Sequence, residues 1–404
     1  MVAWKNTTLG EVAPFWTGKI KATKLNCDNF ISTDNMLSNK GGITKSRYVQ
    51  TKGNSISFKL SDILVSNIRP YFKKIWFADK NGGCSNDILV FRANINHIDP
   101  NFAYYLLSDD NFFDYMMSGA NGTKMPRGNR KHILKYKIKL PPSLIQKKIA
   151  EILSCFDASI NKNLDTIKLL EESARIAYEE TFLRFKIDNN KLKINQSTDL
   201  PFGWQKKPIT SFNSFKQDFS KIKKFEGEKI YYETSDIEYT SILGNGEIIK
   251  WNNKPSRAQI EPKNNTVWFA RMSDTYKVLC FNEENKYLQE KSILSSGFAG
   301  FKATSEKCLP FLYLTISSEF FHEIKNLYAT GATQVSLNNE SMKFIKIVEP
   351  SLDLVENFGI RFLPLIKEIT LLKKKNELLR ESRDILLPRL ITKIIDIEKL
   401  DIVI

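Results

Sequence analysis

The sequence has few of the residues from which disulfide and metal sites are built. Its 404 residues include five cysteines, none in a C-x-x-C pair, at Cys27, Cys84, Cys155, Cys280 and Cys308. The three histidines also lack the short spacing of a metal-binding pair, and they stand at His97, His132 and His322. We therefore expect reduced thiols, no zinc site and no other bound metal.

Long apolar runs are missing as well. No segment has the uninterrupted apolar length that a membrane span requires, and the opening residues, MVAWKN, lack the apolar segment of a secretory signal. We expect a cytoplasmic protein with no membrane partner.

The sequence shows none of the usual motifs of enzymes that act on DNA. A P-loop is absent, since Ala13 stands where the glycine preceding Gly18-Lys19 would have to be. A base-flipping amino-methyltransferase needs an Asn/Asp-Pro-Pro-aromatic loop, and the only double proline, Pro141-Pro142, lacks both flanks. The nearest carboxylate pair, Glu226 and Glu228, follows a lysine-rich loop and is typical of solvated surface. We expect no catalytic residues and no cofactor on this chain.

What is abundant is positive charge, and it is unevenly placed. The chain has 60 Lys and Arg against 45 Asp and Glu, a net charge of +15. Residues 1–142 hold 21 basic and 10 acidic residues, and residues 190–350 hold 22 and 18. The stretches 143–189 and 351–404 are near neutral, with 7 against 8 and 10 against 9. Basic units of this kind favour a polyanion such as nucleic acid, although a lysine-rich soluble protein of another kind is the alternative.

Residues 141–186 have the pattern of one long helix. Pro141-Pro142 ends the preceding strand, and Ser143 can cap the first helical turn. From there, apolar or small residues recur at steps of four and three, the period of a coiled-coil seam, at Ile149, Leu153, Phe156, Ile160, Asn163, Ile167, Leu170, Ala174 and Ala177. No Gly or Pro interrupts 143–186, so the helix would run roughly 65 Å at 1.5 Å per residue.

The same pattern returns 209 positions later. Residues 169–176 (LLEESARI) align with 378–385 (LLRESRDI), and the shared offset also superposes Gly122 on Gly331 and Pro141 on Pro350. The chain is therefore interpreted as a tandem repeat of globular unit and long helix. In the second helix, Pro364 and Pro388 predict a short helix before residue 363, a long one from Pro364, and a stop or kink near Pro388.

Each globular unit has the pattern of an α+β fold. In the first, residues 57–66 and 86–91 predict strands, and 100–117 has helical spacing. The second opens at Pro201 and repeats the order with a strand at 266–270 and a helix at 310–327. We place the domains at 1–140, 141–187 for the first long helix, 188–350 with an N-terminal linker, and 351–404 for the second helix and tail.

Cations gather at predicted strand ends and turns of both units. An arginine can bind guanine O6 and N7, a glutamine can bind adenine N6 and N7, and lysines hold phosphates. The candidates of the first unit lie at 69–74 and 124–131, and are Arg69, Lys73, Lys74, Lys124, Arg127, Arg130 and Lys131. Those of the second unit are Lys254, Arg257, Arg271, Lys277 and Gln334. Arg69 and Arg271 are predicted to hold matching positions, each reading bases in its own unit.

The whole chain resembles the specificity subunits of type I restriction–modification systems. The resemblance rests most on residues 379–391 (LRESRDILLPRLI), which are similar to the C-terminal signature of that family. Further similar stretches are 140–146 (LPPSLIQ), 201–204 (PFGW) and 66–70 (SNIRP). Pro364 and residues 349–351 depart from the pattern.

The resemblance implies two target recognition domains that each read one half of a split site in double-stranded DNA. The long helices would form an antiparallel coiled coil between them, with pseudo-two-fold symmetry. Such a subunit is not catalytic: it docks two modification subunits that use S-adenosylmethionine, and ATP- and magnesium-dependent restriction subunits join them. A self-sufficient nuclease or methyltransferase, and a basic scaffold for an acidic protein or membrane surface, are the alternatives.

Each helical seam contains one asparagine, Asn163 in the first and Asn376 in the second. With the 209-residue offset removed, their pairing would centre an antiparallel two-fold at position 165, near the midpoint of the first helix. A buried polar pair lowers stability but fixes register. We therefore expect Asn163 and Asn376 to meet and to set the distance between the recognition domains. Two exposed asparagines are the alternative.

Overall fold

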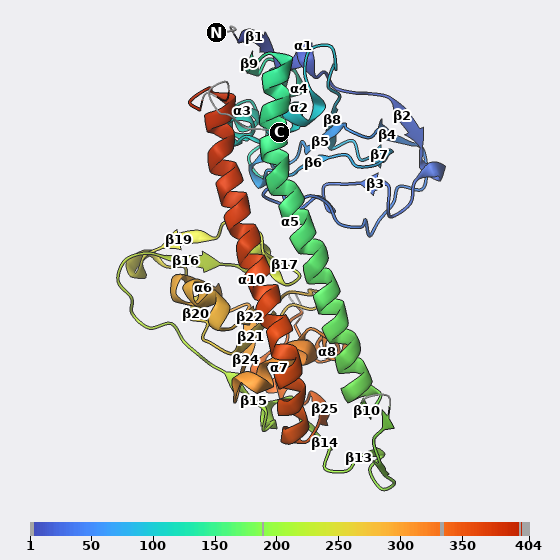
Figure 1. Ribbon diagram of the computed structural model, residues 1–404, viewed down its shortest axis with the longest axis vertical. Helices are drawn as coiled ribbons and strands as arrows, with labels where there is room; N and C mark the ends of the chain where they lie inside the picture. The colour runs from blue at the N-terminus through green and yellow to red at the C-terminus, as the bar shows by residue number, and fades with distance from the viewer. Residues whose placement is uncertain (1–3, 188–189, 332–334, 396, 398–404) are drawn as a thin grey trace. The chain divides into compact units, whose positions relative to one another are not determined.

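A computed structural model describes residues 4–187, 190–331, 335–395 and 397 (Figure 1). Its contacts divide the chain into two units, each of which combines distant parts of the sequence. Unit 1 comprises residues 1–160 and 378–404, and unit 2 comprises residues 161–377. Each unit therefore contains an α+β layer together with part of both long helices.

Unit 1 contains two small sheets, one antiparallel and one mixed. One sheet has the order β6-β5-β8, and the other has the order β2-β4-β7-β3. Their bounds are β5 Ile63–Ser66, β6 Ile75–Phe77, β8 Ile88–Phe91, β2 Lys19–Lys21, β3 Phe30–Ile31, β4 Asn54–Phe58 and β7 Gly82–Cys84. The predicted strand at 57–66 is thus divided between β4 and β5, because the chain turns at Ser61, where φ is +68°. The predicted strand at 86–91 is confirmed as β8, which is fully buried.

Short helices cover the first of these sheets. The bounds are α1 Leu9–Val12, α2 Pro100–Ser108, α3 Asp110–Ser118 and α4 Arg130–Ile133. The predicted helix at 100–117 is broken in two because Asp109 takes an extended conformation and caps α3 by accepting from Asn111 N. Phe102 and Phe112 are buried with β5 and β8 in one apolar core. A separate ladder, β1 Lys5–Thr8 with β9 Lys137–Leu140, joins the first and last strands of the α+β layer.

Unit 2 repeats this order of elements. Its sheets have the orders β15-β24-β21-β22 and β19-β16-β23-β20, and β14 pairs with β25 as β1 does with β9. The strand bounds are β14 Gln205–Pro208, β15 Phe215–Asp218, β16 Lys229–Tyr232, β17 Ile237–Glu238, β18 Ser241–Ile242, β19 Glu247–Ile249, β20 Ala258–Ile260, β21 Thr266–Ala270, β22 Val278–Phe281, β23 Ser292–Ser295, β24 Phe298–Ala303 and β25 Lys346–Glu349. The helices are α6 Lys286–Lys291, α7 Leu309–Ile316, α8 Glu319–Leu327 and α9 Asn339–Met342. The tandem repeat of α+β units is confirmed.

Two short ladders lie at and just before the predicted N-terminal linker of the domain 188–350. β10 Lys186–Ile187 pairs with β11 Asn190–Lys191, and β12 Ile194–Asn195 pairs with β13 Leu200–Pro201.

The two long helices are confirmed in length but not in every detail. α5 runs Ser143–Tyr178 and continues as a π-helical turn, Glu179–Leu183. α10 runs Leu352–Ile391 without interruption, so the predicted break before Pro364 is wrong. The helix ends at Ile391, three residues after Pro388 and close to the predicted stop. Pro364 cannot donate to the carbonyl of Ile360, but Ile360 is 57% exposed, so water can satisfy that carbonyl.

Within unit 2 the helix segments pair in antiparallel fashion, and the predicted asparagine contact is confirmed. Asn163 Nδ2 donates to Asn376 Oδ1 at 2.7 Å, and both side chains are buried. Farther along, Phe182 of the first helix packs on Phe358 of the second. The repeat-related positions, Ile167 and Leu372, are apolar and buried, so the polar pair occurs once rather than twice.

One donor of the paired asparagine amides lacks a hydrogen bond to any described residue. Within the described part of the chain, Asn376 Nδ2 is buried without a hydrogen-bond partner. A buried polar contact of this kind favours one register over its neighbours while lowering stability. That it sets the distance between recognition domains stays a prediction.

We predict that Asn163→Leu lowers the free energy of unfolding by about 1–3 kcal/mol, because it leaves the Asn376 amide with no partner. The double variant Asn163→Leu, Asn376→Leu removes both polar groups and should recover at least the wild-type stability. Urea unfolding of the full chain measures both. Asn161→Leu, at an exposed position of the same helix, is the control and should change stability by no more than about 0.5 kcal/mol. Simple addition of the two single effects in the double variant would contradict the pairing.

Candidate nucleic-acid interface

In unit 1, two basic loops that are distant in sequence lie side by side. The backbone N–H of Arg69, after β5, donates to the carbonyl of Pro126 at 2.8 Å, and Ile68 forms an antiparallel bridge with Arg127. Gly128 N donates to the carbonyl of Asn67 at 3.1 Å. We call residues 67–74 and 121–128 the recognition element of unit 1. It brings Arg69 and Arg127 together.

Arg69 is held in an unusual conformation. Its φ is +49°, in the left-handed region that non-glycine residues rarely adopt, and its carbonyl accepts from Phe72 N at 3.0 Å. Its Nε is buried and, among the described residues, has no hydrogen-bond partner. A buried donor without a partner is unfavourable, so this position is suited to a ligand that supplies an acceptor.

The two lysines that follow are bound to the protein itself. Lys73 Nζ pairs with Asp110 at 2.8 Å, and Lys74 Nζ donates to the carbonyl of Thr33 at 2.7 Å. Burial acts to raise the pKa of Asp110, but its contacts with Lys73 and Lys40 outweigh burial and lower that pKa below its ordinary value. These lysines therefore shape the recognition element as well as adding charge to it.

The other predicted DNA-binding cations of unit 1 are exposed. Arg127 pairs with Asp87 at 3.2 Å, and Arg130 donates to the carbonyl of Asn86 at 3.3 Å. Lys124 and Lys131 are exposed and have no partner within the described ranges. Asn129 fixes the start of α4 by accepting from Lys131 N and His132 N, which places Arg130 and Lys131 in its first turn.

Unit 2 contains a matching recognition element, residues 271–277 with 335–337. Ser273 N donates to Val335 O at 2.9 Å, Met272 bridges Ser336, and Leu337 N donates to Arg271 O at 2.8 Å. By these contacts Ser273 occupies the position of Arg69, and Arg271 occupies that of Asn67. The predicted equivalence of Arg69 and Arg271 is therefore wrong by two residues.

The Arg271 side chain is bound to its own unit. Nε donates to the carbonyl of Phe298 at 2.8 Å, one terminal nitrogen donates to the carbonyl of Leu337 at 3.1 Å, and the other donates to Asn339 Oδ1 at 2.8 Å. Burial lowers the pKa of Arg271. Its guanidinium therefore links the two segments of the recognition element to each other and to α9.

The remaining candidates of unit 2 divide into bound and exposed groups. Lys277 matches Lys74 in the strand register, and it donates to the carbonyl of Thr234 at 2.8 Å as Lys74 does to that of Thr33. Lys254 donates to the carbonyl of Ala258 at 3.3 Å and lies over the Trp251 ring. Arg257 is exposed beside the loop that precedes β24. Gln334 lies outside the described residues.

A buried lysine that sequence reasoning missed holds the unit 2 element. Lys325 of α8 donates to the carbonyls of Ala270 at 3.3 Å, Met272 at 3.0 Å and Thr275 at 2.7 Å, and burial lowers its pKa to about 8. The 209-residue offset places Met116 at this position in unit 1. There the hydroxyl of Ser66 donates to the carbonyl of Ile68 at 3.0 Å, whereas the matching Ala270 has no hydroxyl. The sequence indicates this role by a lysine, Lys325, that interrupts the apolar pattern of the predicted helix at 310–327.

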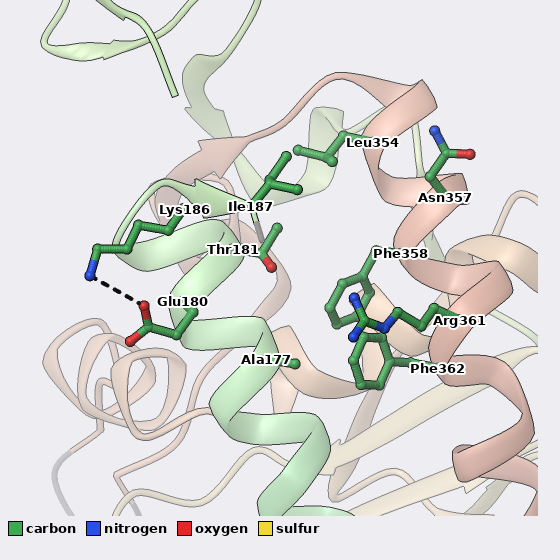
Figure 2. A pocket seen from close by; sticks show the side chains of 10 residues that line it. All are labelled: Ala177, Glu180, Thr181, Lys186, Ile187, Leu354, Asn357, Phe358, Arg361 and Phe362. Carbon is green, nitrogen blue, oxygen red and sulfur yellow. Dashed lines mark ion pairs between the residues drawn. The ribbon is translucent and has the colours of Figure 1, made fainter. Parts of the chain in front are cut away.

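A hollow of about 410 Å³ lies elsewhere in unit 2, between the end of α5 and the start of α10. Figure 2 shows the rings of Phe358 and Phe362 on one wall and the ion pair of Lys186 with Glu180, 3.5 Å long, on the other. None of the predicted DNA-binding residues lines it. It belongs to the helices and not to the recognition element.

The described residues contain no group of three or more His, Cys, Asp or Glu side chains arranged to hold a metal ion. In the same ranges, no helix is both long and apolar enough to cross a bilayer.

We predict that Lys325→Met lowers the free energy of unfolding by about 1–3 kcal/mol, because three loop carbonyls lose their donor. Adding Ala270→Ser, which copies unit 1, should recover about 1 kcal/mol through one new hydrogen bond. Chemical unfolding measures both changes. Lys343→Met, at an exposed lysine paired with Glu340, is the control and should have an effect within about 0.5 kcal/mol. Wild-type stability in Lys325→Met, or no recovery on adding the serine, would contradict this reading.

Comparisons with known proteins agree with the geometry. Residues 1–171 match the family profile of the type I restriction modification DNA specificity domain. The chain is 22% identical to the type I restriction enzyme HindI specificity subunit of Haemophilus influenzae, over 97% of this chain and 99% of that protein. It is also 22% identical to the MjaVIII specificity subunit of Methanocaldococcus jannaschii, over 98% and 94%.

A solved structure shares the fold. The S subunit of the type I restriction–modification system from M. genitalium matches with a TM-score of 0.50 and 16% identity, over 96% of each chain. Residues 1–171 therefore carry the type I restriction modification DNA specificity domain, and along its full length the chain is similar to specificity subunits of type I restriction enzymes.

Proposed function

We propose that each α+β unit reads one half of a bipartite site in double-stranded DNA. The observation that carries this proposal is the recognition element itself, which recurs at matching backbone positions in two basic units. In each, a loop after a buried strand pairs with a turn before a short helix. The similarity to specificity subunits supports DNA recognition, and the assignment of one half-site to each unit is our own step.

The structure suggests different roles for the cations. Lys124 and Lys131 are exposed point charges suited to phosphates, as are Arg127 and Arg130 once their weak surface pairs exchange. Arg69, with its unmatched Nε in a fixed backbone, is suited to a base edge. In unit 2 the exposed Arg257 is the better candidate for that role, because the Arg271 donors are engaged.

Exposed apolar residues on the helices support docking of partner subunits. Leu169 and Ile176 of α5 are seven residues apart and are 71% and 49% exposed, and Leu183 in the π-helical turn that follows is 44% exposed. Under the repeat, Leu378 and Ile385 of α10 match the first two and are 54% and 49% exposed. A seven-residue stripe lies on one helix face and can pack against another helix. The hollow in Figure 2 adjoins the first stripe, since Ala177 and Glu180 line it.

We propose that these two stripes bind two copies of a modification subunit, one at each. The modification subunits would supply S-adenosylmethionine-dependent methylation, and restriction subunits would bring ATP- and magnesium-dependent cleavage. This chain would itself be non-catalytic and act in the cytoplasm. The repeat supports a pair of equal partners, because related surfaces accept related ligands.

We predict that the full chain binds duplex DNA with a steep dependence on salt. Several phosphate contacts should give a slope of roughly −0.9 per contact in a plot of log affinity against log salt. Fluorescence anisotropy over a salt series measures it, and Lys124→Ala should reduce the slope by about one contact on every sequence. A flat salt response would overturn DNA binding, and magnesium-dependent cleavage by the isolated chain would indicate a nuclease instead.

We predict that Arg69→Ala and Arg257→Ala each weaken base preference in one half-site only, by roughly 1–3 kcal/mol at the position read. Binding selection from a duplex pool randomised in both half-sites measures the preference. Arg271→Ala is the contrast: since it removes three hydrogen bonds within unit 2, it should lower thermal stability first. An equal loss on all sequences for Arg69→Ala would reassign that residue to a phosphate contact.

A further inference from the structure

In both units the tip of a small hairpin touches the chain at or next to the last residues of the first recognition-element segment, 67–74 in unit 1 and 271–277 in unit 2. The hairpin of unit 1 spans residues 36–43, and that of unit 2 spans residues 237–242 (β17 and β18). In unit 1, the N–H groups of Asn39 and Lys40 donate to the carbonyls of Phe72 and Lys73 at 2.8 and 2.9 Å. In unit 2, Tyr239 bridges Lys277 and accepts from Val278 N at 2.8 Å.

These tips have an unfavourable backbone conformation. Asn39, Lys40 and Tyr239 have φ values of +52°, +60° and +50°, and Lys73 in the opposing loop of unit 1 has +50°. Non-glycine residues keep left-handed conformations of this kind where surrounding contacts impose them. The contacts that hold each tip are therefore part of what shapes the recognition element.

In unit 1 the tip is held by an ion cluster. The side chain of Lys40 is only 6% exposed, and its Nζ lies 3.0 Å from Asp110 of α3 and 3.5 Å from Asp384 of α10. Asp110 also binds Lys73 of the recognition element at 2.8 Å. Asp384 binds the neighbouring Arg383, whose other partner is Asp157 of α5. A continuous series of charged contacts thus joins both long helices to the recognition element.

In unit 2 the tip is held by different residues from the same helices. Lys373 of α10 donates to the carbonyl of Thr240 at 3.1 Å and lies 2.8 Å from its hydroxyl. Glu171 of α5 accepts from that hydroxyl at 3.1 Å and pairs with Lys373 at 3.1 Å. The hydroxyl of Tyr313 donates to the same carboxylate at 3.2 Å.

We propose that the two hairpin tips are positioning elements for DNA recognition, each tying the recognition element of its unit to the paired long helices. Lys40 and Thr240 are then specificity-determining residues that act through the loops they hold. The residues that hold the hairpin tip differ between the two units, whereas the contact between the tip and the recognition element is present in both. This inference rests on the proposed reading of one half-site by each unit, and it adds residues that need not touch DNA.

The test uses the full chain and a pool of DNA duplexes with both half-sites randomised, followed by sequencing of the bound fraction. Lys40→Met should reduce the enrichment of preferred bases by about fivefold in the half-site read by unit 1, the factor that one hydrogen bond of typical strength represents, and leave the other unchanged. Thr240→Val should do the reverse. Hydrogen exchange adds a direct readout, since the amides of residues 39 and 40 should exchange faster in Lys40→Met.

Matched controls are available on the same elements. Lys45→Met removes an exposed lysine that follows the unit 1 hairpin and pairs with Asp28, and Lys375→Met removes an exposed lysine of α10. Both should leave the two enrichments at wild-type values. Lys40→Arg keeps the charge and should retain most of the preference.

Each result either supports or overturns the inference. Unchanged enrichment in both half-sites, or an equal loss in both, overturns it, as does a lower melting temperature without any change of preference. If Lys40→Met does not fold, Asp384→Asn gives the same measurement, because Asp110 still holds the lysine while the link to α10 is lost. Absence of any base preference in the wild-type chain would instead overturn the proposed function.

Discussion

The structure depends on burying the apolar seam of two helices that have no core of their own. In unit 2, Ile167 and Ala174 of α5 share one core with Val355 and Ile366 of α10 and with the sheet of β21 and β24. In unit 1, a separate segment of each helix does the same with β5 and β8. Each α+β layer is therefore completed by helix segments from two distant parts of the sequence. In the chain, each α+β layer is followed by one long helix, and the other helix segment that completes its core comes from elsewhere in the sequence.

Much of the architecture could be predicted because it depends on spacing alone. The seam of α5, its start at Ser143 and the meeting of Asn163 with Asn376 all follow from a period and an offset. Pro364 was misjudged because sequence alone does not show whether the carbonyl it leaves unpaired faces water or the core. At Ile360 it belongs to an exposed residue, and the helix continues.

The interface was harder to predict, because residue type does not show which partner a cation takes. Arg69 and Arg271 both follow a buried strand, yet the backbone register matches Arg271 with Asn67, since the offset between the copies grows along the chain from 200 at β1 to 209 at β9. Lys74 and Lys277 are basic residues at strand ends, and both bind threonine carbonyls of their own unit. Lys325 in unit 2 and Ser66 in unit 1 donate to equivalent loops from different elements, which no alignment of residue types would reveal.

The ladders that close each α+β layer have a consequence for how such a chain can change. In unit 2 the layer begins on β14 and ends on β25, and these strands are hydrogen-bonded neighbours, with Gln205 opposite Glu349. Entry and exit are thus separated by one strand spacing, about 4.8 Å. A single genetic exchange of the intervening segment would replace the α+β layer between these strands and keep both attachment points. Under the proposed function, such an exchange would change the target sequence in one step, without the gradual substitution of individual contacts.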